Sequence, residues 1–427
     1  MALDDAARRR TDLGRLFAAA FAADLATYLI YTAIPYKALR LGADPLALGL
    51  VATAAAGAYA LLVAVSGRFS DRAPREALAR AACIGIVVAC IGLTLARGVP
   101  RILAFVPLVG GSLAFFWPCV QAAIADRSQG HELEHNLGRF NLAWSVGKGC
   151  GFLLGGLLLS AFGAESVLTA GSALMFVIFW VLPGKPGPAT VLHAPAARPG
   201  EGEDATAPLR ETHFSETSAL GPPDLALEAQ TVRFRRLAWI ANGSAYGVAA
   251  TLIYHYPRLV DAHGWSPRIF GLILGGMYFT ETVAFFLLMR HASAWRFRRA
   301  PLFIPQLLLA AGIVALPWAT GVRLAVTAVV FGFALAACYS ASIYYSLHGA
   351  AERGRNAGIH ELLIGIGSMT VPLAGGLLAR RLGMEWAPYA TAGAVVILSI
   401  VAQEVSLRAE PNKKRPRSRA AVALLRE

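Results

Sequence analysis

The chain has 427 residues, of which 56% are hydrophobic and only 15% are charged, and its formal net charge is +13. Because about 25% of the residues of an ordinary soluble domain are charged, this chain cannot cover a water-exposed surface with charge and is expected to lie in a lipid bilayer. The basic residues occur in short clusters between apolar runs, a pattern that argues against nucleic-acid binding and indicates orientation in a membrane.

The apolar segments predict the architecture, because a bilayer span takes about 20 apolar residues. The first six candidate spans are residues 15–37, 46–66, 77–96, 102–124, 138–161 and 164–183. The next six are residues 236–257, 267–289, 301–319, 323–346, 357–379 and 386–406. The predicted fold class is therefore an all-α integral membrane protein with twelve transmembrane helices in two six-helix bundles.

The gap between the two sets of spans is rich in Pro, Gly, Ala, Glu and Thr, which is typical of a flexible linker. We accordingly expect an N-terminal segment (1–14), a first bundle (15–183), a linker (184–235), a second bundle (236–407) and a basic tail (408–427). A monomer is expected.

The distribution of Lys and Arg predicts the orientation. With the N-terminus inside, 29 of the 39 basic residues fall in inner segments and 9 in outer ones, and Lys148 lies within a span. Since basic residues concentrate on the cytoplasmic side, both termini and the linker are expected in the cytoplasm of a cell inner membrane or plasma membrane.

The two halves of the chain also repeat. Pro35, Gly42, Pro45, Gly49 and Leu50 recur 222 residues later, at Pro257, Gly264, Pro267, Gly271 and Leu272. At an offset of 220, Asn136, Gly138, Gly147, Gly155 and Gly156 match Asn356, Gly358, Gly367, Gly375 and Gly376. Repeated bundles of this kind face each other around a shared site.

The loop after the second span resembles the signature loop of the major facilitator superfamily. The residues that match its pattern are Gly67, Asp71, Arg72 and Arg75, whereas Pro74 and Glu76 depart from it. The resemblance implies two bundles that alternate access to a central cavity, with this loop as a cytoplasmic gate that latches the outward-open state. By analogy, Asp71 is expected near Asn356.

The fifth span carries a second motif, in which Gly147, Gly151 and Gly155 recur every four residues and form a groove for close helix packing. It resembles the fifth helix of the superfamily's drug–proton antiporters, with Phe152 in place of Pro. The eleventh span carries the complementary variant, with Gly367, Pro372 and Gly375 but Val371 in place of Gly. The resemblance favours export. The fourth span, from Arg101 to Arg127, lacks the buried arginine expected of those antiporters.

Few ionisable residues lie inside the spans, and such residues usually mark a pathway. The candidates for proton coupling or substrate binding are Asp24, Lys148, Glu281 and Glu361. The structural alternative is that Lys148 neutralises Asp24 or Glu281 and only holds the bundle together. His360, next to Glu361, is expected to face solvent or lipid headgroups.

Polar and aromatic residues near these charges are candidates for the cavity wall, since aromatic rings stack on organic ligands. They are Trp117, Gln121, Asn141, Trp144, Ser145, Asn242 and Tyr246. Ordinary packing inside the bundles is the alternative for each of them.

The sequence contains no nucleophile elbow, zinc-protease motif or Walker loop, so no enzyme is expected. It predicts no cofactor and no metal; the five cysteines fall in apolar runs without a CxxC pair. We predict a proton-coupled secondary transporter of a small organic solute, with export favoured. An uptake symporter for a metabolite or anion, a lipid flippase and a non-transporting membrane sensor are the alternatives.

Overall fold

The computed structural model describes residues 2–72, 74–128, 130–184, 225–348 and 353–409, and the described residues form helices and turns without a β-strand. The helices of the first half are α1 (Ala2–Arg40), α2 (Pro45–Arg72), α3 (Arg75–Thr94), α4 (Val99–Ala125) and α5 (Gly130–Val181). Those of the second half are α6 (Leu225–Ala262), α7 (Pro267–Arg290), α8 (Ala292–Trp295), α9 (Ala300–Ala315), the 3-10 turn η1 (Leu316–Trp318), α10 (Val322–Leu347), α11 (Arg353–Leu382) and α12 (Ala387–Ala409). Most of the predicted linker and of the basic tail lies outside the described residues.

The all-helical membrane fold is confirmed, and the count of twelve spans stays a prediction. Ten helices of the described chain are long and apolar enough to cross a bilayer. One of them holds both the fifth and the sixth predicted spans, which are separated at Gly163 (φ 82°, ψ 173°), a conformation that glycine adopts without strain. The helix α6 is not among the ten, because polar residues such as Asn242 and Tyr246 lower its hydropathy.

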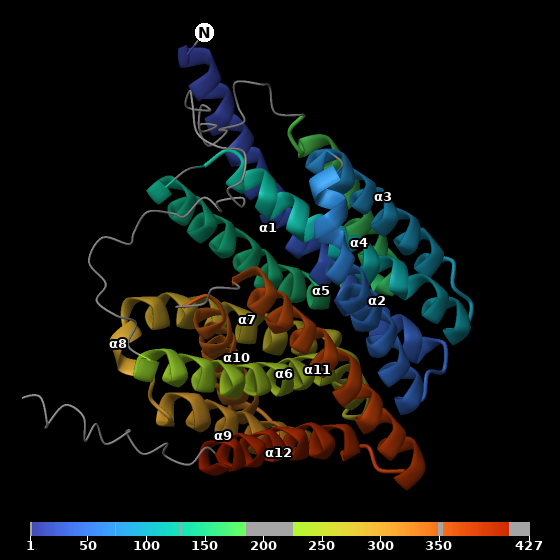
Figure 1. Ribbon diagram of the computed structural model, residues 1–427. Coiled ribbons are helices and arrows are strands. Elements are labelled where there is room, and N and C mark those ends of the chain that lie inside the picture. The colour runs from blue at the N-terminus through green and yellow to red at the C-terminus, as the bar shows by residue number, and fades with distance from the viewer. Residues whose placement is uncertain (1, 73, 129, 185–224, 349–352, 410–427) are drawn as a thin grey trace, which may run out of the picture.

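The helices form two groups, with α1–α5 above α6–α12 in Figure 1. Within the first group, the groove of Gly147, Gly151 and Gly155 receives α1. A Cβ at Gly151 would lie 2.7 Å from the carbonyl oxygen of Leu25, so only glycine allows this approach. The groove predicted from the sequence is therefore a packing surface inside one bundle.

The second group repeats this packing with the glycine moved to the partner helix. Gly367 of α11 lies against the backbone of Gly243 in α6. One turn further along, Val371 occupies the position where the first half has glycine, and Gly247 of α6 faces it, so that a Cβ there would lie 2.9 Å from Val371 Cβ. The departure at Val371 is thus compensated on α6.

Two interfaces join the bundles, and we call them the α5–α7 seam and the α2–α11 seam; Figure 1 shows the ends of α2 and α11 meeting at the lower right. In the first seam, a Cβ at Gly156 would lie 2.9 Å from the carbonyl oxygen of Pro267. In the second, the repeat partner Gly376 lies against the carbonyl of Pro45. Equivalent residues therefore make equivalent contacts, which confirms the predicted repeat.

The seams close one half of the space between the bundles. Their close contacts join residues 45–60 to residues 365–376, and residues 145–156 to residues 267–282. Toward the end that carries the N-terminus, Gln121 of α4 and Asn141 of α5 are exposed. A cavity that is open toward that end remains between the bundles.

Candidate functional site

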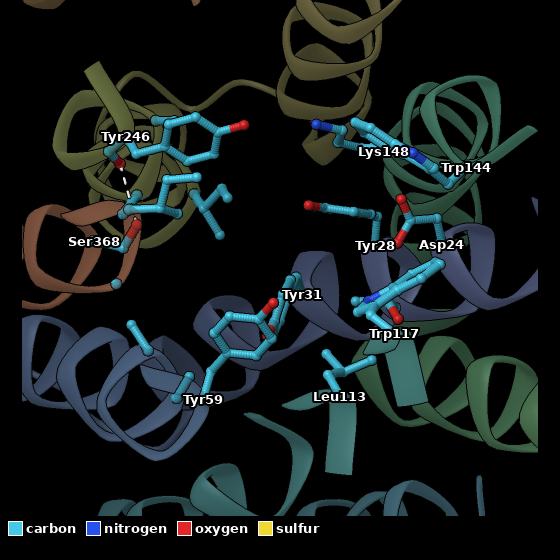
Figure 2. A pocket seen from close by; sticks show the side chains of 18 of the residues that line it. Asp24, Tyr28, Tyr31, Tyr59, Leu113, Trp117, Trp144, Lys148, Tyr246 and Ser368 are labelled. Carbon is cyan, nitrogen blue, oxygen red and sulfur yellow. Dashed lines mark hydrogen bonds between the residues drawn. The ribbon is translucent and has the colours of Figure 1, made fainter. Parts of the chain in front are cut away.

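The cavity has a volume of about 270 Å³ and is lined by residues of α1, α2, α4, α5, α6, α7, α10 and α11. Both bundles therefore contribute to its wall. Figure 2 shows Asp24, Tyr28, Trp144 and Lys148 on one side of it and Tyr246 and Ser368 on the opposite side. A site divided in this way changes shape whenever the bundles move relative to each other.

Asp24 is the more buried of the two carboxylates on the cavity wall, the other being Glu361. It lies in the middle of α1, its residue is 5% exposed, and its carboxylate interacts electrostatically with both Lys148 and Glu281. Burial of a carboxylate in a membrane helix is costly, and the position of Asp24 on the cavity wall gives its charge access to whatever the cavity holds.

Lys148 and Glu281 form an ion pair across the α5–α7 seam. The Nζ atom of Lys148 lies 2.9 Å from Oε2 of Glu281, and the two side chains are 3% and 1% exposed. Beside this pair, Ser145 and Thr282 share a hydrogen bond of 2.5 Å between their hydroxyl groups. The pair therefore joins the bundles directly, and removal of either partner would leave the other buried charge without its ion-pair partner.

Three aromatic rings surround the ammonium group of Lys148. Its Nζ lies 4.3 Å from the ring centroid of Tyr278, 4.9 Å from that of Trp144 and 5.8 Å from that of Tyr28. Distances of about 6 Å or less favour cation–π attraction. The rings offset part of the cost of burying the lysine.

The predicted cavity residues divide into two sets. Trp117, Gln121, Asn141, Trp144 and Tyr246 line the cavity, as do Asp24, Lys148 and Glu361. Ser145, Asn242 and Glu281 lie off its wall. Ser145 and Glu281 are engaged in the α5–α7 seam, and Asn242 points into the interior of the second bundle, where its Nδ2 lies 3.4 Å from Nδ1 of His360.

Tyrosines dominate the part of the wall that sequence reasoning missed. They are Tyr28, Tyr31, Tyr59, Tyr254, Tyr278 and Tyr339. Two of them were within reach of the pattern, since Tyr28 and Tyr31 follow Asp24 at spacings of four and three residues, which places all three on one helix face. The repeat also offered a signal, because Tyr59 is the counterpart of Glu281 at the offset of 222.

The expectation that His360 faces solvent or lipid headgroups is wrong. The residue is 0% exposed, and its Nδ1 lies 2.8 Å from the hydroxyl oxygen of Ser342. Its ring also packs edge-on against Tyr339. The neighbouring Glu361 points to another side of α11 and lines the cavity, because consecutive helical residues are turned by about 100°.

At the N-terminal end of the first bundle, the gate loop is described in part. The side chains of Gly67, Asp71 and Arg72 lie outside the described residues, so the expected proximity of Asp71 to Asn356 stays a prediction. Arg75 forms an ion pair with Asp126 and donates a hydrogen bond of 3.1 Å to the carbonyl of Ala122.

The expectation that the segment from Arg101 to Arg127 contains no buried arginine is wrong at its last residue. Arg127 follows α4 directly and is 0% exposed. Its Nη2 lies 2.9 Å from Oε1 of Glu76, and its Nε lies 3.6 Å from Oδ2 of Asp12. These two carboxylates make its burial tolerable, and they tie α1, α3 and α4 together beneath the gate loop.

At the opposite end, each seam has a polar contact at a helix N-cap. Asp44 accepts a hydrogen bond of 2.7 Å from the backbone N–H of Ala47 in α2, and its carboxylate lies 3.4 Å from Nε of Arg380 in α11. In the other seam, Ser266, the N-cap of α7, is hydrogen-bonded to Ser160 of α5 at 2.9 Å. The repeat relates these contacts, since Asp44 corresponds to Ser266 and Ser160 to Arg380.

The described residues contain no group of three or more His, Cys, Asp or Glu side chains that could hold a metal ion. The residues that line the cavity offer hydrogen bonds, aromatic surface and charged groups to a ligand. These are the means by which proteins usually bind small organic molecules.

Comparison with known proteins gives a consistent result. The family model of the Major Facilitator Superfamily matches residues 16–260 and 237–426. Solute carrier family 67 member A1 of Homo sapiens is 31% identical over 189 residues, which cover 43% of this chain and 42% of that protein, so the match spans less than half of this relative.

Solved structures share the fold at low identity. A bacterial homologue of the human lysosomal transporter Spinster, in an inward-facing and occupied conformation, has a TM-score of 0.66 at 15% identity and covers 93% of this chain and 96% of its own. A peptide transporter POT in complex with sulfate has a TM-score of 0.69 at 12% identity, with coverages of 93% and 94%. The nucleoside transporter NupG has a TM-score of 0.63 at 12% identity, with coverages of 92% and 99%.

Proposed function

The chain belongs to the major facilitator superfamily of membrane transporters, and from this premise we propose that it is a proton-coupled secondary transporter of small organic solutes. The observation that carries the proposal is a buried carboxylate, Asp24, on the wall of a cavity built by both bundles. A carboxylate at this place can bind and release a proton in the cavity that holds the solute. Movement of the bundles then exposes the proton site and the solute site to the other side of the membrane.

Asp24 is the preferred proton carrier because the other buried acid is engaged. Glu281 is bound to Lys148 at 2.9 Å, whereas Asp24 borders the cavity directly. Glu361, nearer the open end of the cavity, is the second candidate and would accept the proton from the cytoplasm. Among the ionisable candidates that the sequence offered, we therefore prefer Asp24 to Glu281 as the proton carrier.

We propose export as the direction of transport, because the glycine motif of α5 resembles that of the superfamily's drug–proton antiporters. In that cycle the solute enters from the cytoplasm, to which the N-terminal end of the cavity opens if the basic residues orient the chain as predicted. The mixed wall of tyrosines, Gln121, Asn141 and two carboxylates suits an amphiphilic solute better than a lipid tail. This favours a solute transporter over a flippase.

Proteoliposomes that enclose a pH-sensitive dye test the proposal. A panel of cationic, neutral and anionic aromatic solutes is added under an imposed pH gradient, and the internal pH is followed. We expect a pH change that depends on protein and on a subset of solutes, and its loss in Asp24→Asn. Ser406→Ala, an exposed position near the end of α12, serves as the matched control. Undiminished proton movement in Asp24→Asn would refute the assignment.

A further inference from the structure

The aromatic surroundings of Lys148 have the form of a binding site for an ammonium ion. The rings of Tyr28, Trp144 and Tyr278 have their centroids between 4.3 and 5.8 Å from Nζ, and Glu281 supplies a carboxylate oxygen at 2.9 Å. Proteins recognise alkylammonium ligands with cages of this composition, in which ring faces attract the cation and an acid balances its charge. Here the cage is filled by a side chain of the protein itself.

Two observations indicate that the cage is more than a lysine's packing environment. First, Tyr28, Trp144, Lys148 and Tyr278 all line the cavity, so a ligand in the cavity reaches the same rings. Second, Oε1 of Glu281 has no hydrogen-bond partner although the side chain is only 1% exposed. A buried carboxylate oxygen without a donor has unused capacity for a cationic ligand.

We propose that this cage is an ammonium site in which Lys148 is the built-in occupant, and that the ammonium group of a solute displaces Lys148 from Glu281. The inference rests on the proposed transport function and names its substrate class, an organic solute that carries an amine or quaternary ammonium group. In the structure Lys148 also interacts electrostatically with Asp24, and we infer that this second carboxylate compensates the charge of the lysine when a solute takes its place.

Displacement has a mechanical consequence. The ion pair between Lys148 and Glu281 joins α5 to α7 and thereby one bundle to the other. A solute that takes the place of Lys148 breaks the ion pair between α5 and α7 and contacts Glu281 and the aromatic rings instead. Solute binding thereby removes the ionic contact of the α5–α7 seam, and such a difference in interaction between two states is what a ligand needs in order to shift a conformational equilibrium.

Calorimetric titration of the purified full-length protein at alkaline pH tests the competition. The probes are choline and its uncharged isostere 3,3-dimethylbutan-1-ol. Lys148→Gln vacates the cage, and we expect it to bind choline about tenfold or more tightly than the wild type does, with no gain for the isostere. Lys148→Arg keeps the cage filled and should resemble the wild type. Adding Glu281→Gln to Lys148→Gln should abolish the gain.

If Lys148→Gln binds choline no better than the wild type, the cage is a packing environment only and the proposal fails. A second measurement avoids the risk that the variant does not fold. In the wild-type protein, choline should increase the modification of Lys148 by an amine-reactive reagent, measured by peptide mass spectrometry, because the lysine leaves its cage. Protection or no change at a saturating choline concentration would overturn the proposal.

These equilibrium measurements use no gradient, so they separate the two proposals. Loss of solute-dependent proton movement with intact choline competition would refute transport coupling and leave the ammonium site standing. Retained proton movement without competition would refute the ammonium site alone.

Discussion

The α5–α7 seam and the α2–α11 seam are built from the same repeat but hold the bundles together in different ways. At their glycines they are alike, since Gly156 and Gly376 make equivalent contacts with Pro267 and Pro45. In the middle of the bilayer they differ. The first seam has the buried pair of Lys148 and Glu281, whereas the repeat partners of these residues in the second seam are Ser368 and Tyr59, both on the cavity wall.

This difference separates two tasks. The shared glycines set how closely the helices approach, which both seams need in order to close. The buried charged pair is present in the α5–α7 seam only, whereas the ion pair of the α2–α11 seam, Asp44 with Arg380, is exposed at the helix ends. We therefore expect the α5–α7 seam to respond to a charged ligand in the cavity and the α2–α11 seam not to respond. Substitutions at repeat-related positions of the two seams test this difference.

The largest effect is expected when the charged pair is broken. Glu281→Ala leaves Lys148 buried without its partner, and losses of about 3–5 kcal/mol are typical for such changes. The double variant Lys148→Met/Glu281→Leu should regain most of the stability, since it removes both charges. Ser368→Ala, at the repeat position of Lys148, should cost less than about 1 kcal/mol. Chemical unfolding in detergent micelles measures all three, and equal losses for Glu281→Ala and Ser368→Ala would contradict the asymmetry.

A second and smaller effect should be equal in the two seams. A Cβ at Gly156 would lie 2.6 Å from Gly271 Cα, and one at Gly376 would lie 3.2 Å from His255 Cε1 and closer still to the Pro45 carbonyl. Alanine at either site should disfavour the closed seam by about 1–3 kcal/mol and slow solute-dependent proton movement. Gly276→Ala is the control, because nothing lies within 4 Å of a Cβ there. A large difference between Gly156→Ala and Gly376→Ala would mean that the seams do not close alike.

The contacts at the helix N-caps should matter less and should differ in their response to salt. Asp44 and Arg380 are 44% and 60% exposed, and an exposed pair contributes about 1 kcal/mol or less. The effect of Arg380→Gln on stability should vanish near about 1 M salt, where the Debye length is about 3 Å. Ser160→Ala breaks an uncharged contact, so its effect should be independent of salt. A salt-independent effect of Arg380→Gln would show that Arg380 acts other than through its charge.

The smallest predicted effect concerns the loop before α12. Arg258 forms a bidentate ion pair with Glu385, and its hydrogen bonds hold the pKa of that carboxyl below the ordinary value of 4.5. A lowered folded-state pKa contributes stability that is present above pH 4.5 and is lost as the pH falls through the folded-state pKa. Because the Glu385 side chain is 50% exposed, its share is below about 1 kcal/mol. Unfolding between about pH 3 and pH 6 should be less pH-dependent in Glu385→Gln; an unchanged profile would exclude this contribution.

The arrangement of the bundles could be predicted from the sequence because glycine and proline recur at positions where the backbone conformation or a close helix contact requires them, in both halves of the chain. Gly49, Gly156 and Pro45 were identified from the repeat alone, and each lies at an inter-bundle contact. The apolar runs predicted the long helices, and they include α6, which contains the predicted span 236–257 although its buried polar residues lower its hydropathy.

The site was only partly predictable. Helical periodicity shows which residues share one face of a helix, but it does not show which other helix packs against that face. Lys148 had two candidate partners, Asp24 and Glu281, and only the packing of α5 against α7 selects the second. His360 was expected to face solvent or lipid headgroups, whereas Ser342 of α10 and Asn242 of α6 provide it with a buried polar environment that the sequence does not reveal. Tyrosine is also common as packing in helix bundles. Among the tyrosines of the cavity, the sequence therefore pointed only to Tyr28 and Tyr31, through their spacing to Asp24, and to Tyr59, through the repeat.

The central claim is that the bundles alternate around Asp24, and paired spin labels test it most directly. In a variant without the five native cysteines, one pair is placed at Gly138 and Arg290, at the open end, and another at Ala161 and Arg268, beyond the seams; all four positions are exposed. Neutralising the carboxylate with Asp24→Asn should shift the two distance distributions in opposite directions, one shortening as the other lengthens. Distributions that remain unchanged, or that change in the same direction, would contradict alternating access governed by Asp24.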